Sequence, residues 1–232
     1  FSRSPLAAQQ GEPIRMDEQF TPQSCFHVKC QVQIRGKLEG KDDAGMTLSF
    51  AVVGESLVVY DEATLAINNN VVDRTLRLFS KLDFQRKVGQ DVKKASLRPE
   101  VSRIVILRQN NIEVPFSPDG SLRLADEVEL IRTDVFTPSL VGLLPKVPVK
   151  KGDNWIADEI ATRELTDLDK ITAGQLKCTL EKIEDGDARV FFDGTVAGIN
   201  EDGPTQHQLY GSDKLKNAGK YLRYVEIQGV QE

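Results

Sequence analysis

Cysteine, histidine and tryptophan are scarce in this sequence, and the shortage of cysteine and histidine argues against disulfide scaffolds and metal sites. The 232 residues include three cysteines, two histidines and one tryptophan. Three cysteines fit neither a dense disulfide scaffold nor a four-ligand zinc site. The two histidines, His27 and His207, are far apart in the sequence, and we expect both to face solvent from strands. We therefore expect neither a metal site nor a cofactor.

Long apolar runs, a basic excess and the common catalytic motifs are missing as well. No stretch approaches the roughly 18 apolar residues that a membrane-spanning helix needs, so we expect no transmembrane segment. The formal charge is −5, and the basic residues are interspersed with acids, which disfavours a nucleic-acid partner. The nucleophile elbow, the phosphate-binding loop and the zinc-protease helix motif have no match.

The N-terminal residues favour export from the cell. Leu6, Ala7 and Ala8, followed by Gln9, have the small-residue character of a signal-peptidase site. Residues 1–16 are therefore expected to be either a signal-peptide remnant or a disordered tail, and the protein to be periplasmic or extracellular. Residues 17–232 are expected to form a single β-rich domain, or two similar halves joined near 132–155.

Alternation of apolar and polar residues predicts strands in both parts of the chain. The pattern runs through residues 24–35 and resumes at 46–52, which indicates a hairpin. Residues 74–88 fit a strand or a helix, and we favour a strand. A second hairpin is expected at 101–107 and 112–116, with Pro115 on an edge strand. Near the C-terminus, four strands separated by short turns predict a meander: 176–183, 188–196, 206–215 and 221–227.

Helical spacing appears between these strands. We expect a short amphipathic helix at 124–131, a brief one at 139–144, and the clearest one at 158–171, ended by Gly174. Together these elements predict an α+β protein: a long, curved, half-barrel-like antiparallel sheet with two or three helices packed on one face.

The cysteines leave two interpretations open. Cys25 and Cys30 are five residues apart on one predicted strand, so their side chains point to opposite faces and cannot readily bond each other. Cys30 could pair with Cys178 of a later strand. Alternatively, all three are buried or half-buried thiols that behave as small apolar residues.

The segment LLPKVPVKKGDNW, residues 143–155, ends in the only tryptophan. Its prolines enforce an extended backbone and Gly152 allows a turn, so Trp155 is expected at the start of the next helix as a buried anchor. The alternative is a tryptophan that contacts a ligand. Phe192, Tyr210 and Tyr224 complete the candidate ligand-binding set with Trp155, because aromatic side chains on a curved sheet could line an apolar groove. The alternative is that they belong to the core.

Carboxylates in turns are the candidates for chemistry. Glu100, Asp119 and Asp153 each lie beside a proline or glycine, and two facing acids would suit a glycosidase-like hydrolase. Turn geometry explains the same residues more simply. Asp185 and Asp187, around Gly186, hint at calcium, but a tight hairpin turn accounts for them and no twelve-residue calcium loop follows.

Four segments resemble a family of exported proteins from planctomycete-type bacteria. They are LRPEVSRIVILR (97–108), FSPDGSLRLADEVELI (116–131), LLPKVPVKKGDNW and LKCTLEKIEDGDARVFFDGTVAG (176–198). The resemblance implies export, a half-barrel similar to lipoprotein-carrier folds, and further sequence after residue 232. It departs at Ser121, where proline is usual, and at the additional Lys151. The shared phrases are structural, so the resemblance brings no activity with it.

The sequence thus predicts an exported, non-enzymatic binding or structural protein of the cell envelope. Its expected partner is an apolar small molecule or lipid, held in a groove between sheet and helices, or an envelope protein. The alternative is a hydrolase that uses the turn carboxylates.

Overall fold

The computed structural model describes residues 12–18, 20–41, 43–68, 71–109, 112–132, 135–200, 203–216 and 221–231. The chain divides into two compact units. One comprises Phe20–Asp134, and the other combines Phe1–Gln19 with Val135–Glu232. Residues 6–9, which carry the predicted export signal, lie outside the described residues.

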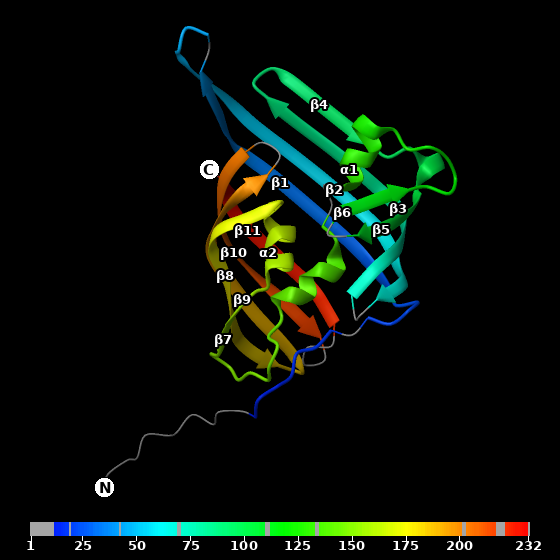
Figure 1. Ribbon diagram of the computed structural model, residues 1–232, viewed down its shortest axis with the longest axis vertical. Coiled ribbons are helices and arrows are strands. Elements are labelled where there is room, and N and C mark those ends of the chain that lie inside the picture. Colours follow the sequence, from blue (N-terminus) through cyan, green and yellow to red (C-terminus); the bar gives the residue numbers. More distant parts are fainter. Residues whose placement is uncertain are drawn as a thin grey trace. The chain divides into compact units, whose positions relative to one another are not determined.

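The first unit is built on a six-stranded antiparallel sheet (Figure 1). Its strands are β1 (Cys25–Lys41), β2 (Thr47–Asn68), β3 (Val71–Val88), β4 (Asp91–Ser96), β5 (Arg103–Gln109) and β6 (Ile112–Phe116). The order is β1-β2-β3-β5-β6, and β4 also pairs with β3. Besides β2, two strands pair with different parts of β3: its residues 83–88 pair with β4 and its residues 74–78 pair with β5.

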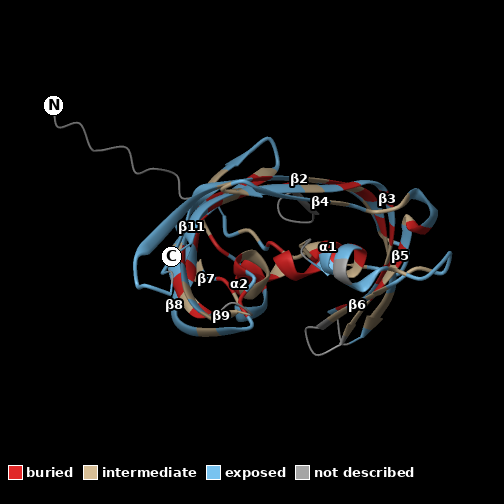
Figure 2. Ribbon diagram, turned by 90° about the horizontal axis from the view of Figure 1, so that it is seen from above, coloured by how far each residue is buried: buried red, intermediate tan, exposed pale blue. Residues whose placement is uncertain are grey.

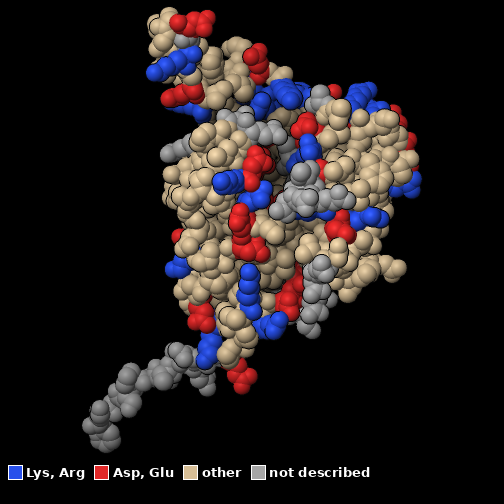
Figure 3. Space-filling view, viewed as in Figure 1, with Lys and Arg blue, Asp and Glu red and all other residues tan. Residues whose placement is uncertain are grey.

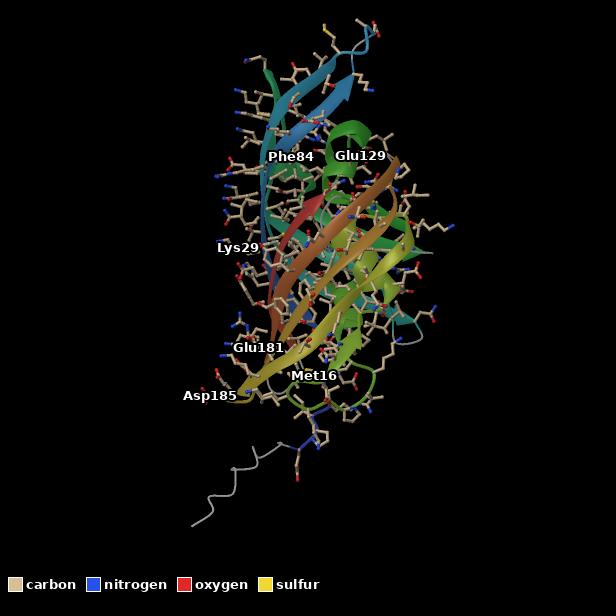
Figure 4. All side chains as sticks on the ribbon, turned by 90° about the vertical axis from the view of Figure 1, so that its left-hand side faces the viewer. Met16, Lys29, Phe84, Glu129, Glu181 and Asp185 are labelled. Atoms are coloured by element: carbon tan, nitrogen blue, oxygen red, sulfur yellow. The ribbon has the colours of Figure 1, made fainter. Side chains whose placement is uncertain are left out.

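The two faces of this sheet differ because side chains alternate along each strand. We call the face that carries the even-numbered side chains of β1 and β2 the inner face. Val58, Tyr60 and Leu82 are buried on it, as are Ile104 and Ile106 of β5. The strands curve around the short helix α1 (Glu129–Arg132), which carries Glu129 on this side, whereas Lys29 projects from the opposite side (Figures 2 and 4).

The second unit contains a five-stranded antiparallel sheet with the order β11-β10-β9-β8-β7. Its strands are β7 (Asn154–Ile156), β8 (Lys170–Glu184), β9 (Asp187–Asn200), β10 (Gly203–Lys216) and β11 (Tyr221–Gln231). The helix α2 (Glu159–Thr166) packs against the 3-10 helix Thr137–Leu143 and against β8. An N-terminal stretch joins this unit through the bridge between Ile14 and Val149. Its core gathers side chains from all these elements: Met16, Leu140, Leu143, Ala161, Leu176, Cys178, Leu180, Val190, Phe192, Leu209 and Leu215.

The predicted strands and hairpins are confirmed. Residues 25–41 and 47–68 form one hairpin, and 74–88 lie in a strand. Pro115 is on β6, the edge strand of its sheet. The C-terminal meander is present as β8 to β11. At the β8–β9 turn, Asp185 and Gly186 both have positive φ, 52° and 81°, which is the geometry of a two-residue hairpin turn.

The expected fold class is wrong. Strands account for 64% of the described residues and helical turns for 13%, so the protein is mainly β rather than α+β. There are two sheets instead of one long half-barrel-like sheet, with β1 and β11 each at the edge of its own sheet. In place of two or three packed helices, the described chain has one regular helix of eight residues, α2. Residues 124–132 form a π-helical turn followed by the four residues of α1, and residues 137–143 form a 3-10 helix.

The clearest predicted helix is half as long as expected. Asp158 caps its start, but the helix ends at Thr166, because Asp167 adopts the left-handed conformation with φ of 54°. From Lys170 onward the chain pairs with β9 instead, with Ile171 opposite Gly198. Gly174 is not a helix end. It is a strand residue with φ of 82°, where a Cβ would lie 2.0 Å from the Thr195 carbonyl oxygen.

Two further expectations about single residues are corrected. His207 does not face solvent. It lies on the buried side of β10, two residues before Leu209, and is 9% exposed. The bond between Cys30 and Cys178 is not formed, because Cys178 is a free thiol. Its side chain is fully buried in the five-stranded unit, and that burial raises the pKa of the thiol to about 12.

Candidate ligand-binding face

The inner face of the six-stranded sheet stays apolar beyond the end of its buried core. The side chains that continue the rows of Val58 and Tyr60 are large and apolar but are about half-exposed: Val32 (42%), Ile34 (44%) and Leu38 (55%) of β1, with Leu48 (40%) and Phe50 (42%) of β2. We call these five residues the apolar face. Contiguous exposed apolar surface of this kind marks interaction sites in soluble proteins.

The register of the hairpin explains why these residues share one side. Leu38 is directly opposite Phe50, and Ile34 is opposite Gly54, without a register shift anywhere along the β1–β2 pair. The intervening residues of β1, Gln33, Arg35, Lys37 and Glu39, are polar, exposed and point to the outer face. The end of this hairpin carries side chains of both charge signs (Figure 3). The exposed part of the β1–β2 hairpin is therefore amphipathic, with an apolar inner face and a polar outer face.

Glycines make hollows between the apolar side chains. Gly36 lies opposite Val52, Gly40 opposite Leu48 and Gly54 opposite Ile34. A Cβ at Gly36 or Gly40 would have no atom within 4 Å, and at Gly54 it would lie 3.6 Å from the Ile34 Cβ. Gly36 and Gly40 thus leave open space beside an aliphatic side chain of the neighbouring strand, whereas Gly54 is buried and its position is bordered by Ile34 and Arg86. A flexible hydrocarbon can contact both the side chains and the backbone floor there.

The apolar face has one cationic border. Arg86 of β3 is opposite Gly54, and its Cγ lies 3.7 Å from the place where a Gly54 Cβ would stand. The aliphatic stem of Arg86 therefore adds to the apolar surface while its guanidinium reaches solvent. Phe84 and Val88, on the same side of β3, are half-buried and connect Arg86 with the rest of the sheet.

The buried end of the inner face contains a group of buried polar side chains. Tyr60, Glu62 and Arg77 are each 2% exposed or less. Arg77 Nε donates to Glu62 Oε1 at 3.3 Å, and the Arg77 guanidinium carbon lies 4.6 Å from the centre of the Tyr60 ring. This group is closed to solvent, so it delimits the apolar face and is not itself an accessible site.

The four residues proposed from the sequence as ligand-binding do not come together. Phe192 is fully buried in the core of the five-stranded unit. Trp155, on β7, is half-buried, and its Nε1–H donates to the Leu143 carbonyl oxygen at 2.7 Å. Tyr210 and Tyr224 are exposed, and both lie on the face of the sheet opposite Leu209 and Leu215. Trp155 lies on β7, four residues before α2 begins at Glu159, rather than at the start of the helix, and it packs against the core of the five-stranded unit.

The turn carboxylates have local partners or lie at the surface. Asp119 forms a two-bond ion pair with Arg103, in which Nε donates to Oδ2 at 3.0 Å. Asp153 Oδ2 accepts from the Lys150 amide at 2.8 Å and so closes a turn. Glu100 is exposed in the 3-10 helix Pro99–Val101. Among the residues that the structure describes, no group of three or more His, Cys, Asp or Glu could hold a metal ion.

Sequence reasoning identified the strands of the apolar face but not its exposure. Alternation in 46–52 and 26–34 showed which side chains are apolar. It could not show that Leu38, Leu48 and Phe50, near the turn of the β1–β2 hairpin, are exposed. A second missed residue is Asp213, which is 1% exposed on the buried side of β10. The signal was its place between Leu209 and Leu215 in the same alternation.

No family model, curated protein or solved structure matches this chain. In the described residues, no helix combines the length and the apolar character needed to cross a membrane. The fold and the site define the chain as a two-unit antiparallel β protein with an exposed apolar sheet face.

Proposed function

We propose that the chain is an exported, non-enzymatic binding protein that holds an apolar molecule on the apolar face of its six-stranded unit. The observation that carries the proposal is the run of five large apolar side chains, each at least 40% exposed, on one side of one hairpin. Keeping such a surface in water is costly, so a bound partner that covers it is stabilising. The pattern of residues 6–9 supports the export part, as does the resemblance to exported bacterial proteins.

Exposed apolar residues on the outer face do not form a comparable surface. Val53, for example, is 54% exposed but is flanked in register by Arg35 and Lys87. Single apolar residues among charged ones are normal on protein surfaces. The contrast between the two faces of the same strands is what makes the inner face the candidate.

Binding of an environment-sensitive apolar fluorophore, such as N-phenyl-1-naphthylamine, tests the proposal. We expect saturable binding to the wild-type protein. Leu38→Asn removes roughly 50 Å² of apolar contact, which at about 25 cal/mol per Å² weakens binding about tenfold. Phe50→Asn is expected to weaken it at least as much.

Val53→Asn is the matched control, because Val53 is on the same strand as Phe50, is more exposed and faces the other way. It should leave the dissociation constant unchanged. Equal weakening by Val53→Asn and Phe50→Asn, or no saturable binding to a wild-type protein shown to be folded by circular dichroism, would rule out this face. Export is tested separately, by fractionating the cells that naturally make the protein and locating it with an antibody.

A further inference from the structure

Two cations lie side by side at the border of the apolar face. One row across the sheet contains Ile34 of β1, Gly54 of β2, Arg86 of β3 and Lys93 of β4, each directly opposite the next. Directly opposite residues on antiparallel strands have Cβ atoms about 5 Å apart and project to the same side. Arg86 and Lys93 therefore form an adjacent pair of positive charges on the inner face, next to Ile34.

The two like charges repel each other, and an anion bound between them would relieve that repulsion. Like charges directly opposite each other destabilise a sheet. Neither Arg86 nor Lys93 has an ion pair with any acid in the described part of the chain, whereas Arg77, Arg98, Arg103 and Arg108 of the same unit all do. Asp91 is the acid on this side of β4, but it stands opposite Val88, one row further along. The pair thus keeps a net positive charge at the edge of an apolar surface.

The apolar face has the length of a lipid chain. From the row of Gly54 to the row of Leu48 is six residues of β2, or roughly 20 Å at about 3.4 Å per residue. A membrane lipid chain spans half of a hydrocarbon core that is roughly 30 Å thick, so about 15 Å. A single chain can therefore lie along the hairpin, over the hollows at Gly36 and Gly40, with its head at the cations.

We propose that the ligand is a single lipid molecule with an anionic head, whose head binds Arg86 and Lys93 and whose hydrocarbon chain lies on the apolar face. This inference rests on the proposed function and gives it a substrate class. Charge complementarity selects an anionic head over a neutral one, because hydrogen bonds between ionised groups are roughly twice as strong as neutral ones. The curvature of the sheet toward its inner face favours a single molecule over a flat bilayer surface (Figure 2).

The test compares two lipids with the same chain, palmitoyl lysophosphatidate and monopalmitoylglycerol, by displacement of the bound naphthylamine below their micelle concentrations. We expect the anionic lipid to bind about tenfold more tightly than the neutral one at low ionic strength, and this preference to shrink at high ionic strength. Arg86→Gln with Lys93→Gln should remove the preference, because it should weaken binding of the anionic lipid about tenfold more than binding of monopalmitoylglycerol.

Lys87→Gln with Lys94→Gln is the matched control. These lysines neighbour Arg86 and Lys93 in the sequence, face the other side of the same strands, and change the net charge equally. The control should retain the preference. If both lipids bind equally to the wild-type protein, or if the control loses the preference as the Arg86 and Lys93 variant does, the anionic head is wrong and the apolar binding function stands.

Two other outcomes are distinguishable. If the protein binds neither lipid and no naphthylamine, the proposed function fails together with this inference. Binding to anionic vesicles in sedimentation, without binding of the monomeric lipids, would also overturn the inference, because it would assign the cations to a membrane surface.

Discussion

Arg77 and Glu62 form an ion pair that is closed to water, with 3.3 Å between Nε and Oε1 and side-chain exposures of 0% and 1%. They are directly opposite each other on β3 and β2, and Tyr60 lies against the guanidinium. Taking both charges out of water is costly, and their attraction offsets that cost only while both are present. Loss of one partner would therefore leave an uncompensated buried charge.

Removing one partner should be much more damaging than removing both. We expect Glu62→Gln or Arg77→Met to lower the free energy of unfolding by about 3 to 5 kcal/mol, since each leaves an unbalanced buried group. The double variant should recover most of that loss. Urea unfolding followed by circular dichroism measures it. Additive effects of the two single changes would show that the pair is not coupled.

Trp155 provides a second test of how the chain is held together. Its ring packs against the core of the five-stranded unit, and its indole N–H satisfies the last carbonyl group of the 3-10 helix Thr137–Leu143. Trp155→Phe keeps most of the packing and loses the hydrogen bond, at a cost of about 1 kcal/mol. Trp155→Ala should cost about 3 kcal/mol. Circular dichroism is the required probe, because the change removes the only tryptophan. An unchanged melting temperature for Trp155→Ala would contradict the anchor.

The strands could be predicted because their signal is local and repeated. In β1, for example, Phe26, Val28 and Val32 alternate with polar residues, and the pairing with β2 keeps that register throughout. The helix at 158–171 was overestimated because the spacing of Leu165, Leu168 and Ile171 also suits a helix face. Cross-strand pairing of 170–184 with β9 outweighs that local preference.

The candidate site was predictable only in part. Alternation shows which side of β1 and β2 is apolar, but whether Leu38 and Phe50 are covered depends on elements distant in the sequence. The row that joins Arg86 to Lys93 depends on the β3–β4 register, which the turn between them sets and which no residue pattern marks. Of the aromatic residues chosen from the sequence, Phe192 is buried in a core, whereas Tyr210 and Tyr224 are exposed on the other face of that sheet.

The start of α2 depends on one contact between Asp158 and Gly142. Asp158 Oδ1 accepts from the Ala161 amide at 2.9 Å, and the Asp158 amide donates to the Gly142 carbonyl oxygen at 2.9 Å. A Cβ on Gly142 would lie 2.1 Å from that same Oδ1. Asp158→Ala should therefore cost about 1 kcal/mol, and Asp158→Ser, which can still cap, much less.

Gly142→Ala should cost at least as much as Asp158→Ala, because the new methyl group displaces the capping carboxylate. Combined with Asp158→Ala it should cost less than the sum of the two, as the clash is then gone. Gly36→Ala is the control, because nothing lies within 4 Å of its Cβ position. Thermal melts of the wild-type protein and these five variants measure the differences. Strict additivity of Gly142→Ala and Asp158→Ala would contradict the proposed contact.

Asp213 makes the stability of the five-stranded unit depend on pH between about 4 and about 8. Its side chain is 1% exposed on β10, and neither carboxyl oxygen has a hydrogen-bond partner in the described part of the chain. Burial raises the pKa of Asp213 from 3.8 to about 8 and outweighs the lowering effect of the Val190 backbone, which lies directly opposite; Glu18 adds a smaller increase. Between these two values the unfolded chain releases a proton that the folded protein keeps. The free energy of unfolding therefore falls as pH rises from about 4 to about 8, and levels off above.

Asp213→Asn removes this titration without changing the size of the side chain. Relative to the wild-type protein, we expect the variant to gain stability as the pH is raised from about 4 to about 8, by several kcal/mol in total, with no further gain above that. The contribution of His207, whose pKa burial lowers, cancels in this difference because both proteins carry it. Asp193→Asn, at an exposed position on β9, should show no such trend. Urea midpoints measured at several pH values decide the matter: a difference between Asp213→Asn and wild type that does not change with pH would mean that the carboxyl group is already ionised in the folded protein.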